Sequence, residues 1–586
     1  METFENILKA IESLIWETSI ANLFWENAAE APVILQFPFI VMLLLGTGLF
    51  LTVRLKFMPI WGIPKGFAML WKGRKSDNDD GEVTPFAALA TALSSTVGTG
   101  NIAGVATAIA IGGPGAIFWM WMTALVGMAT KYSESLLAVR YREVDANGTY
   151  KGGPMYYIKN GLGPKWKWLA ILFCIGALGS AAGAGNMAQG NSIAEVMRTS
   201  FGIPNIVTGL IMAAAAFAII IGGIKSIGRV ASKLVPFMGI SYVLIAIVIL
   251  ALNMDGVPAA FGSIFDNAFS GRAAAGGFIG ATIAQAIAFG VNRGLFSNEA
   301  GQGSAPIAHA AAQTKDPVQQ ATIAMLGTFI DTIVICTMTA LIILSVGGNY
   351  KYSAAATQMK FCNAANISVV NADGKQATLN FSSDDIALAK YKLADFEGLG
   401  ADAQTEQLNK RQEATTKLEQ CQSAAPEGFV FDERAFAAIS DFAKLDTDYA
   451  WKSDSESSSI TAAAFEAGIP FGKYFIAISL LIFAFTTILG WSYYGERSIA
   501  YLAGEKSVLP FRVIWCLIVF AGAVLPVQAV WTIGGIGNGL MATPNLIAVL
   551  LLSGIVVSIS RGGKYKRKIE PHDESAHARG EHDVES

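Results

Sequence analysis

The feature that most constrains this chain is a series of about eleven apolar stretches, each close to 20 residues long, which recur along its 586 residues. A stretch of that length crosses a lipid bilayer as a helix, because a helix satisfies all of its backbone N–H and C=O groups internally. The sequence therefore predicts an all-α polytopic membrane protein. The predicted spans are 33–55, 84–112, 114–140, 168–197, 203–223, 230–253, 274–295, 318–346, 469–491, 508–527 and 540–559.

Composition narrows the function. Charged residues make up 15% of the chain, against about 25% in soluble domains, which excludes an ordinary soluble enzyme. The net charge of -3 lacks the basic excess of a nucleic-acid-binding surface. The four histidines and five cysteines show no metal-ligand spacing, and we expect no cofactor.

Three segments lie outside the predicted spans. Residues 1–30 place apolar side chains at helical spacing and are predicted to form an interfacial amphipathic helix rather than a signal peptide. Residues 349–462 form a polar insert in which Cys362 and Cys421 either pair as a disulfide or remain free thiols. Residues 560–586 form a polar tail.

Basic residues in short loops predict the orientation. They follow the first, third and fifth spans and recur after the last one, as Arg54, Arg140, Lys225 and Arg561 illustrate. Such residues concentrate on the cytoplasmic side. The N-terminus and the insert are therefore predicted to lie outside, and the C-terminus inside.

The spans divide into two sets of five, 84–253 and 274–559, preceded by the additional span 33–55. Because five is odd, the second set enters the membrane from the opposite side, as in an inverted-repeat transporter. The first span of each set is predicted to be interrupted, at 94–101 by small polar residues and at 275–280 by glycines. Two alternatives are a packing face made by Gly100 and Gly104 and hydroxyls bonded to their own helix.

An interrupted helix can bind two kinds of ligand. The N–H groups at the start of the resumed half-helix suit a carboxylate, and freed carbonyls beside hydroxyls suit a monovalent cation. One site can then hold an amino-acid zwitterion together with Na⁺.

Four segments, 95–104, 113–121, 152–157 and 294–301, resemble the alanine or glycine:cation symporter family, and the resemblance extends from about residue 34 to 560. It implies a LeuT-type fold with eleven spans and Na⁺-driven uptake of alanine, glycine or a similar small amino acid. It also implies a multi-pass protein of the cell membrane, with a bacterial inner membrane expected. The chain departs from the family in its large outer insert and in lacking an arginine near Ala288.

The resemblance also implies a set of site residues. The substrate-binding candidates are Thr99, Gly100, Asn101, Gln189, Gly276, Gly277, Phe278, Gly280, Thr487 and Trp491. The sodium candidates are Ser94, Val97, Thr486 and Thr487, whose carbonyl and hydroxyl oxygens suit a hard cation. Gln189 could instead form an interhelical hydrogen bond, and Trp491 could be an interfacial aromatic residue.

Ionisable residues inside spans are functional candidates by default. We expect Asp331 to stabilise one conformation of a gate, with a direct ion ligand as the alternative. Lys131 with Glu134, and Arg293 with Glu299, are predicted to form helix-end pairs on the cytoplasmic side. The predicted function is symport of Na⁺ and a small neutral amino acid by alternating access; the alternatives are a cation channel and a membrane-embedded enzyme.

Overall fold

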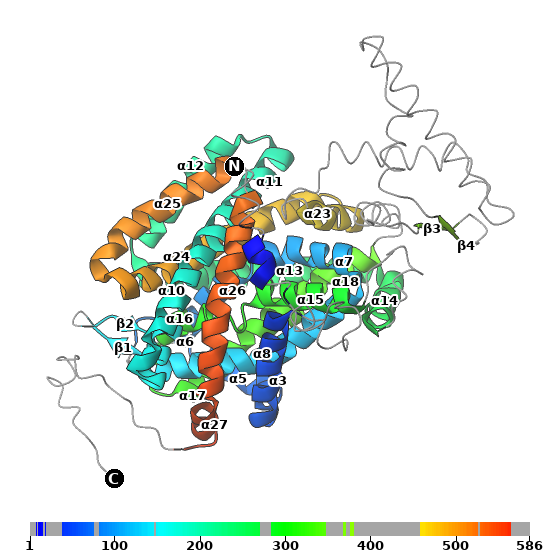
Figure 1. Ribbon diagram of the computed structural model, residues 1–586. Helices are drawn as coiled ribbons and strands as arrows, with labels where there is room; N and C mark the ends of the chain where they lie inside the picture. The colour runs from blue at the N-terminus through cyan, green and yellow to red at the C-terminus, as the bar shows by residue number, and fades with distance from the viewer. Residues whose placement is uncertain are drawn as a thin grey trace.

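The computed structural model describes residues 8, 10–15, 18, 38–74, 81–145, 148–269, 283–346, 367–370, 376–379, 457–525 and 528–563. In these ranges the chain is mostly helical, as predicted. Figure 1 shows α26 running alongside α10 and α3, whereas α12 and α25 lie together at one edge and α14 lies at the opposite edge. The helices up to the polar insert are α3 Phe39–Arg54, α4 Met58–Trp61, α5 Ile63–Lys72, α6 Pro85–Thr96, α7 Val105–Gly112, α8 Gly115–Arg140, α9 Pro154–Tyr157, α10 Lys167–Ala182, α11 Ala188–Phe201, α12 Asn205–Ile220, α13 Gly223–Leu252, α14 Val257–Phe269, α15 Ile283–Asn298, α16 Ala305–Ala310, α17 Pro317–Thr328 and α18 Thr337–Ser345.

Wider π-helical turns interrupt several of these helices. They are η3 Gly100–Gly104, η4 Ile158–Leu162, η6 Gly183–Met187 and η9 Phe329–Cys336. After the insert come α23 Ser457–Gly468, α24 Gly472–Ala503, α25 Val508–Val524, α26 Gln528–Leu551 and α27 Ser553–Ser560. Short 3₁₀ turns lie at η5 Pro164–Trp166, η7 Met254–Gly256 and η10 Glu505–Ser507.

Two antiparallel strand pairs complete the described structure. Strand β1 Glu143–Val144 pairs with β2 Tyr150–Lys151, and Val144 lies opposite Tyr150. Within the insert, β3 Ile367–Val370 pairs with β4 Gln376–Leu379. The rest of the insert up to residue 456, including Cys362 and Cys421, lies outside the described residues.

Six helical segments are long and apolar enough to cross a membrane: Pro164–Phe201, Gly223–Leu252, Pro317–Ser345, Gly472–Ala503, Glu505–Val524 and Thr532–Leu551. Shorter apolar helices are Phe39–Arg54, Gly100–Ile109 and Asn205–Ile220. The chain is therefore a multi-pass membrane protein.

Several predicted boundaries differ from the structure, and α13, for example, begins at Gly223 and not at 230. Helix α24 continues to Ala503, beyond the predicted end of its span at 491. Helix α26 begins at Gln528, well before the predicted 540, and the chain turns at Leu552 before α27. Glycines between 534 and 539 are sites of close helix packing, since a Cβ on Gly537 would lie 2.2 Å from the backbone N of Ser180.

Helix α6 begins and ends for local reasons. Pro85 occupies its first turn, and the Thr84 hydroxyl accepts the Ala87 N–H at 3.1 Å, which caps the N-terminus. At the other end, Ser94, Ser95 and Thr96 bond back to carbonyls of their own helix, and such bonds weaken the helical pattern. Val97 is then extended, with ψ of 98°, so the interruption predicted in 84–112 is confirmed.

A second interruption follows α15. Helical structure stops at Asn298 and resumes at Ala305 in α16. Gly301 and Gly303 take φ values of 90° and 81°, which glycine adopts without steric cost. The predicted interruption at 275–280 falls outside the described residues.

One face of the bundle ties the entry to α6 to the exit of α16. The Glu82 N–H donates to Ala311 O at 2.8 Å, and the Gln313 N–H donates to Val83 O at 2.7 Å. The Arg142 guanidinium donates to Ala310 O at 2.9 Å and to Thr314 O at 2.7 Å. These bonds attach the segment before α6, and Arg142 after α8, to the segment that follows α16.

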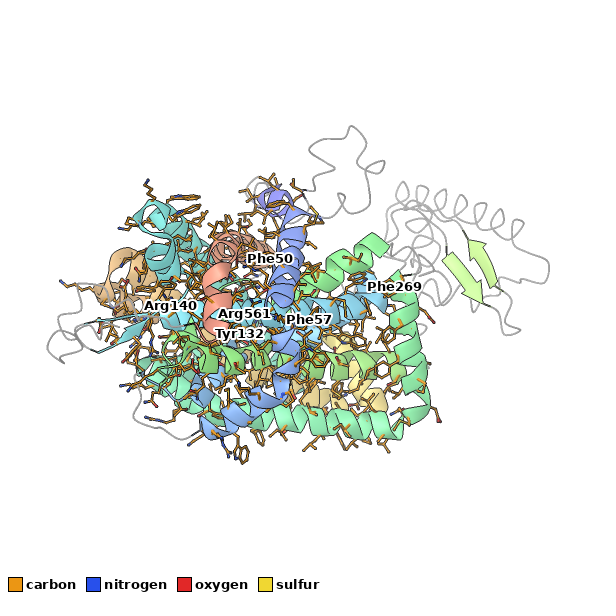
Figure 2. All side chains as sticks on the ribbon, turned by 90° about the horizontal axis from the view of Figure 1, so that it is seen from below. Phe50, Phe57, Tyr132, Arg140, Phe269 and Arg561 are labelled. Atoms are coloured by element: carbon orange, nitrogen blue, oxygen red, sulfur yellow. The ribbon has the colours of Figure 1, made fainter. Side chains whose placement is uncertain are left out.

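Basic residues at the ends of α3 and α27 lie close together. Arg561 donates to Arg54 O at 3.0 Å, and the Tyr132 hydroxyl lies 2.9 Å from Ser560 Oγ. Figure 2 shows Arg140 and Arg561 in the view from below, together with Tyr132, whose side chain is fully buried. Arg54, Arg140 and Arg561 are among the residues that the sequence assigns to one side of the membrane.

We predict that Glu82 gives the protein a pH-dependent stability. Burial raises the pKa of its carboxyl above the ordinary 4.5, against the opposing effect of the Tyr150 N–H bond. The folded state therefore binds this proton more tightly than the unfolded state, so the contribution of Glu82 to stability falls as pH rises above that value. Glu82→Gln retains an oxygen that can accept the Tyr150 N–H but has no titratable proton. It should therefore remove this pH-dependent loss of stability.

Thermal denaturation midpoints in detergent, measured from about pH 4 to about pH 7, check this prediction. The exposed-pair variant Glu195→Gln is the matched control and should follow the wild-type profile. Parallel profiles for the wild type and Glu82→Gln would contradict the assignment.

Candidate functional site

A cavity lined by buried residues lies where the two interrupted helices meet. About 310 Å³ of atom-free space lies in and at the mouth of this cavity. Most of its lining comes from the two interruptions, the turn before α11, and α24. The lining residues are Ser95, Thr96, Gly98, Thr99, Gly100, Ala184, Gln189, Phe296, Glu299, Gln302, Thr487, Trp491 and Asn538.

Gln189 joins α11 to the first interruption. Its Nε2 donates to Thr99 Oγ1 at 3.1 Å and to Ala184 O at 3.0 Å, and its Oε1 lies 3.5 Å from the Thr99 N. The Ala184 carbonyl belongs to the wide turn η6, where helical bonding is relaxed. Gln189 therefore makes the interhelical hydrogen bond considered from the sequence and also lines the cavity.

Asn101 is predicted as a substrate ligand, but its carboxamide bonds within the protein. Its Oδ1 accepts the Gly98 N–H at 2.9 Å, and its Nδ2 donates to Asp331 Oδ1 at 2.7 Å and to Ser297 Oγ at 3.1 Å. It is not among the residues lining the cavity. The structure therefore gives Asn101 a role in holding the shape of the interruption.

Asp331 is fully buried in η9 and lies at the centre of this network. Besides Asn101, it accepts hydrogen bonds from Ser297 Oγ at 2.6 Å and from Thr332 Oγ1 at 2.8 Å. Three side-chain donors therefore hold this carboxyl group in place. Asp331 thereby connects the first interruption to the end of α15.

The sodium candidates are brought together only in part. Thr487 Oγ1 lies 3.4 Å from Val97 O and donates to Phe483 O at 3.0 Å. Ser94 donates to Thr91 O, and Thr486 donates to Phe483 O, each on its own helix. Val97 O and Thr487 Oγ1 thus come together, but of the four candidates only Thr487 lines the cavity.

Trp491 lies on the cavity wall because two glycines leave room for close helix contact. A Cβ on Gly185 would lie 2.4 Å from Trp491 Cγ, and a Cβ on Gly490 would lie 2.0 Å from Ser95 Oγ. Trp491 is buried, with 4% of its surface exposed. It is therefore an internal wall and not an interfacial aromatic residue.

The sequence reasoning missed an acidic residue of the cavity. Glu299 and Gln302 both line it, and Glu299 Oε2 accepts a hydrogen bond from Ser304 Oγ. Within the described part of the chain, Glu299 forms no ion pair with Arg293, and Lys131 forms none with Glu134. Neither predicted helix-end pair forms in these residues: Glu299 and Glu134 accept hydrogen bonds from Ser304 and Asn545 instead, and Lys131 is buried among the helices.

A sequence signal for this second lining segment did exist. The closely spaced Gly301 and Gly303, with Ser297, Asn298 and Ser304 around them, repeat the small polar composition of 94–101. The predicted Gly276, Gly277, Phe278 and Gly280 lie outside the described residues.

A polar cavity enclosed by interrupted helices of a multi-pass bundle defines the chain as a transporter of the secondary type. The model of the sodium:alanine symporter family matches residues 23–379 and 430–578, and the chain belongs to this family. Its members' names associate it with sodium-coupled transport of amino acids.

Three relatives illustrate the range of the family. The sodium/alanine symporter AgcS of Methanococcus maripaludis is 40% identical over 91% of this chain and 96% of its own length. An uncharacterized transporter of Haemophilus influenzae is 39% identical over 98% and 99% of the two chains. A probable sodium/glutamine symporter, GlnT of Bacillus subtilis, is 33% identical over 88% and 86%.

We predict that Gly185→Ala destabilises the protein by about 1–3 kcal/mol, because the added methyl overlaps the Trp491 indole. Gly179→Ala on α10 is the matched control, since its Cβ would meet only Gly537 Cα, at 3.7 Å. Thermal midpoints in detergent and the tryptophan emission spectrum report the effect. Equal midpoints for the two variants would show that Trp491 does not depend on Gly185.

Proposed function

We propose that this chain takes up a small neutral amino acid, alanine or glycine, together with Na⁺ by alternating access. The observation that carries the proposal is the cavity between the two interrupted helices. It combines backbone amides of a resumed half-helix with side-chain hydroxyl, amide and carboxylate groups. An amino-acid zwitterion needs both kinds of partner.

The substrate carboxylate is assigned to the start of the resumed half-helix around Thr99 and Gly100. Gln189 holds the Thr99 hydroxyl and faces the same space. Asn101, which does not line the cavity, stabilises this segment by accepting a hydrogen bond from the Gly98 N–H. Gly276, Gly277, Phe278 and Gly280 remain proposed contributors by resemblance.

Trp491 and Thr487 form the proposed side-chain end of the site. The Trp491 ring, packed tightly on Gly185, leaves little space for a larger substrate side chain. One relative is nevertheless named for glutamine. Uptake measured for alanine, glycine, serine and glutamine in parallel therefore tests the size limit directly.

Na⁺ is assigned to oxygens of Val97 and Thr487. Ser94 lies about one helical turn before Val97, and Thr486 directly precedes Thr487. The distance of 3.4 Å between Thr487 Oγ1 and Val97 O suits two ligands of one ion. No buried carboxylate is required in this set, because the substrate carboxylate can share the cation.

Asp331 is proposed to stabilise one conformation of the gate. Its three side-chain donors tie the first interruption to α15, and a carboxylate so fully occupied is a poor direct ligand for an incoming ion. A movement of α15 relative to Asn101 would have to break these bonds.

The proposed architecture is a LeuT-type arrangement of two inverted five-helix repeats, 84–253 and 274–559, after an additional helix at 33–55. The N-terminus lies outside and the C-terminus inside the cell membrane, in a bacterium its inner membrane. Basic residues at the face with Arg54 and Arg561 support this orientation. The interfacial helix 1–30, the outer insert 349–462 and the cytoplasmic tail 560–586 flank this core.

Uptake of labelled alanine into proteoliposomes tests the function. We expect accumulation only under an inward Na⁺ gradient, and current that depends on the amino acid. Equal uptake with and without the gradient would contradict symport. Single-channel current without amino acid would favour the cation channel instead.

We predict that Thr487→Ala weakens Na⁺ or alanine binding about tenfold or more, because it removes an oxygen shared between α24 and the Val97 segment. Ser498→Ala on the same helix is the control, since its hydroxyl bonds only to Tyr494 O. Titrations of Na⁺ and of alanine in proteoliposomes measure both affinities. Unchanged values for both would remove Thr487 from the site.

A further inference from the structure

We propose that Glu299 and Gln302 bind the α-ammonium group of the transported amino acid. The inference rests on the proposed function, since it takes the cavity as the substrate site. It assigns an anionic end to that cavity, which neither the sequence motifs nor the family name identifies.

Glu299 has a conformation that packing alone does not explain. It follows the last residue of α15 and has φ of 54°, a left-handed value that costs energy for a residue with a side chain. Only 2% of its surface is exposed, yet it lines the cavity. This backbone turn holds a carboxylate at the wall of a polar space inside the bundle.

Gln302 supplies a second acceptor. Its Nε2 donates to Leu295 O at 3.2 Å, which fixes the amide, while its Oε1 has no hydrogen-bond partner within the described structure. The residue is 1% exposed and lines the same cavity. A buried acceptor left without a donor destabilises the protein, so a donor from a ligand would relieve this cost.

Lys131 interacts with Glu299 electrostatically but does not form a hydrogen bond with its carboxyl group. The lysine is buried on α8, and its Nζ has no hydrogen-bond partner among the described residues. Glu134, Glu299 and Asp331 lie close enough to interact with it electrostatically, so one amine is shared among three buried acidic groups. A cationic group in the cavity would give these acidic groups a second positive partner.

An ammonium fits these two acceptors better than a metal ion does. It has three directional donors, which a carboxylate and an amide oxygen can accept. A hard cation requires a larger shell of oxygens, but Phe296 and Trp491 also line the cavity. The amides near Gly100 then accommodate the carboxylate at the other end of the zwitterion.

The test measures alanine binding to the full-length protein in detergent at saturating Na⁺. Glu299→Gln should weaken binding about tenfold or more, since it removes a charge-assisted bond. The double variant Glu299→Gln with Gln302→Glu restores one carboxylate and one amide to the wall, and should recover part of the affinity. The midpoint of the Na⁺-induced fluorescence change without alanine should stay within about twofold of the wild type.

A ligand series tests the same assignment on the wild type. Lactate, which replaces the ammonium by a hydroxyl, should compete with labelled alanine far more weakly than alanine itself, and the gap should narrow in Glu299→Gln. If Glu299→Gln does not fold, Gln302→Met carries the affinity test. An unchanged alanine affinity in the folded variant would overturn the proposal.

Three further outcomes separate the alternatives. A shift in the Na⁺ midpoint with unchanged alanine affinity at saturating Na⁺ would make Glu299 a sodium ligand and overturn the ammonium assignment. A wild-type protein that shows no Na⁺-dependent amino-acid uptake would refute the proposed function itself. Uptake by the wild type with an unaffected Glu299→Gln would refute only this inference.

Discussion

A helix that is interrupted inside a bilayer has to satisfy the backbone groups it releases with other parts of the protein, because no lipid group can do so. Asn101 meets this requirement by accepting the Gly98 N–H while it donates to Asp331. Thr339 donates to Asn101 O at 2.9 Å, and Thr461 donates to Ile102 O at 2.9 Å. The first interruption is therefore held by side chains from helices far apart in the sequence.

This constraint explains which parts of the structure could be predicted. The first interruption was readable because Ser94 to Asn101 combine hydroxyls, glycines and an amide where only apolar residues would otherwise be expected. Four predicted site residues stood out as polar or aromatic side chains within apolar spans. All four line the cavity: Thr99, Gln189, Thr487 and Trp491. In each case the local sequence contained the unusual residue itself.

The rest depended on contacts between distant segments. Asn101 has the chemistry of a ligand, and only its position beside Ser297 and Asp331 shows that its groups are already bonded. Glu299 was predicted to pair with Arg293 at a helix end on the cytoplasmic side, and not to line the cavity. Its left-handed φ and its burial depend on how α15 meets α16, which periodicity does not encode.

The two ends of the cavity belong to elements that are held by different networks. Gly100 packs on Ser297, with a would-be Cβ 3.4 Å from its Cα, and the Asp331 cluster fixes this contact. Thr487 instead approaches Val97 from α24, through a longer contact of 3.4 Å. A ligand that touches both Thr487 and Glu299 therefore changes the relative free energy of arrangements that differ in the spacing of α24 and α15.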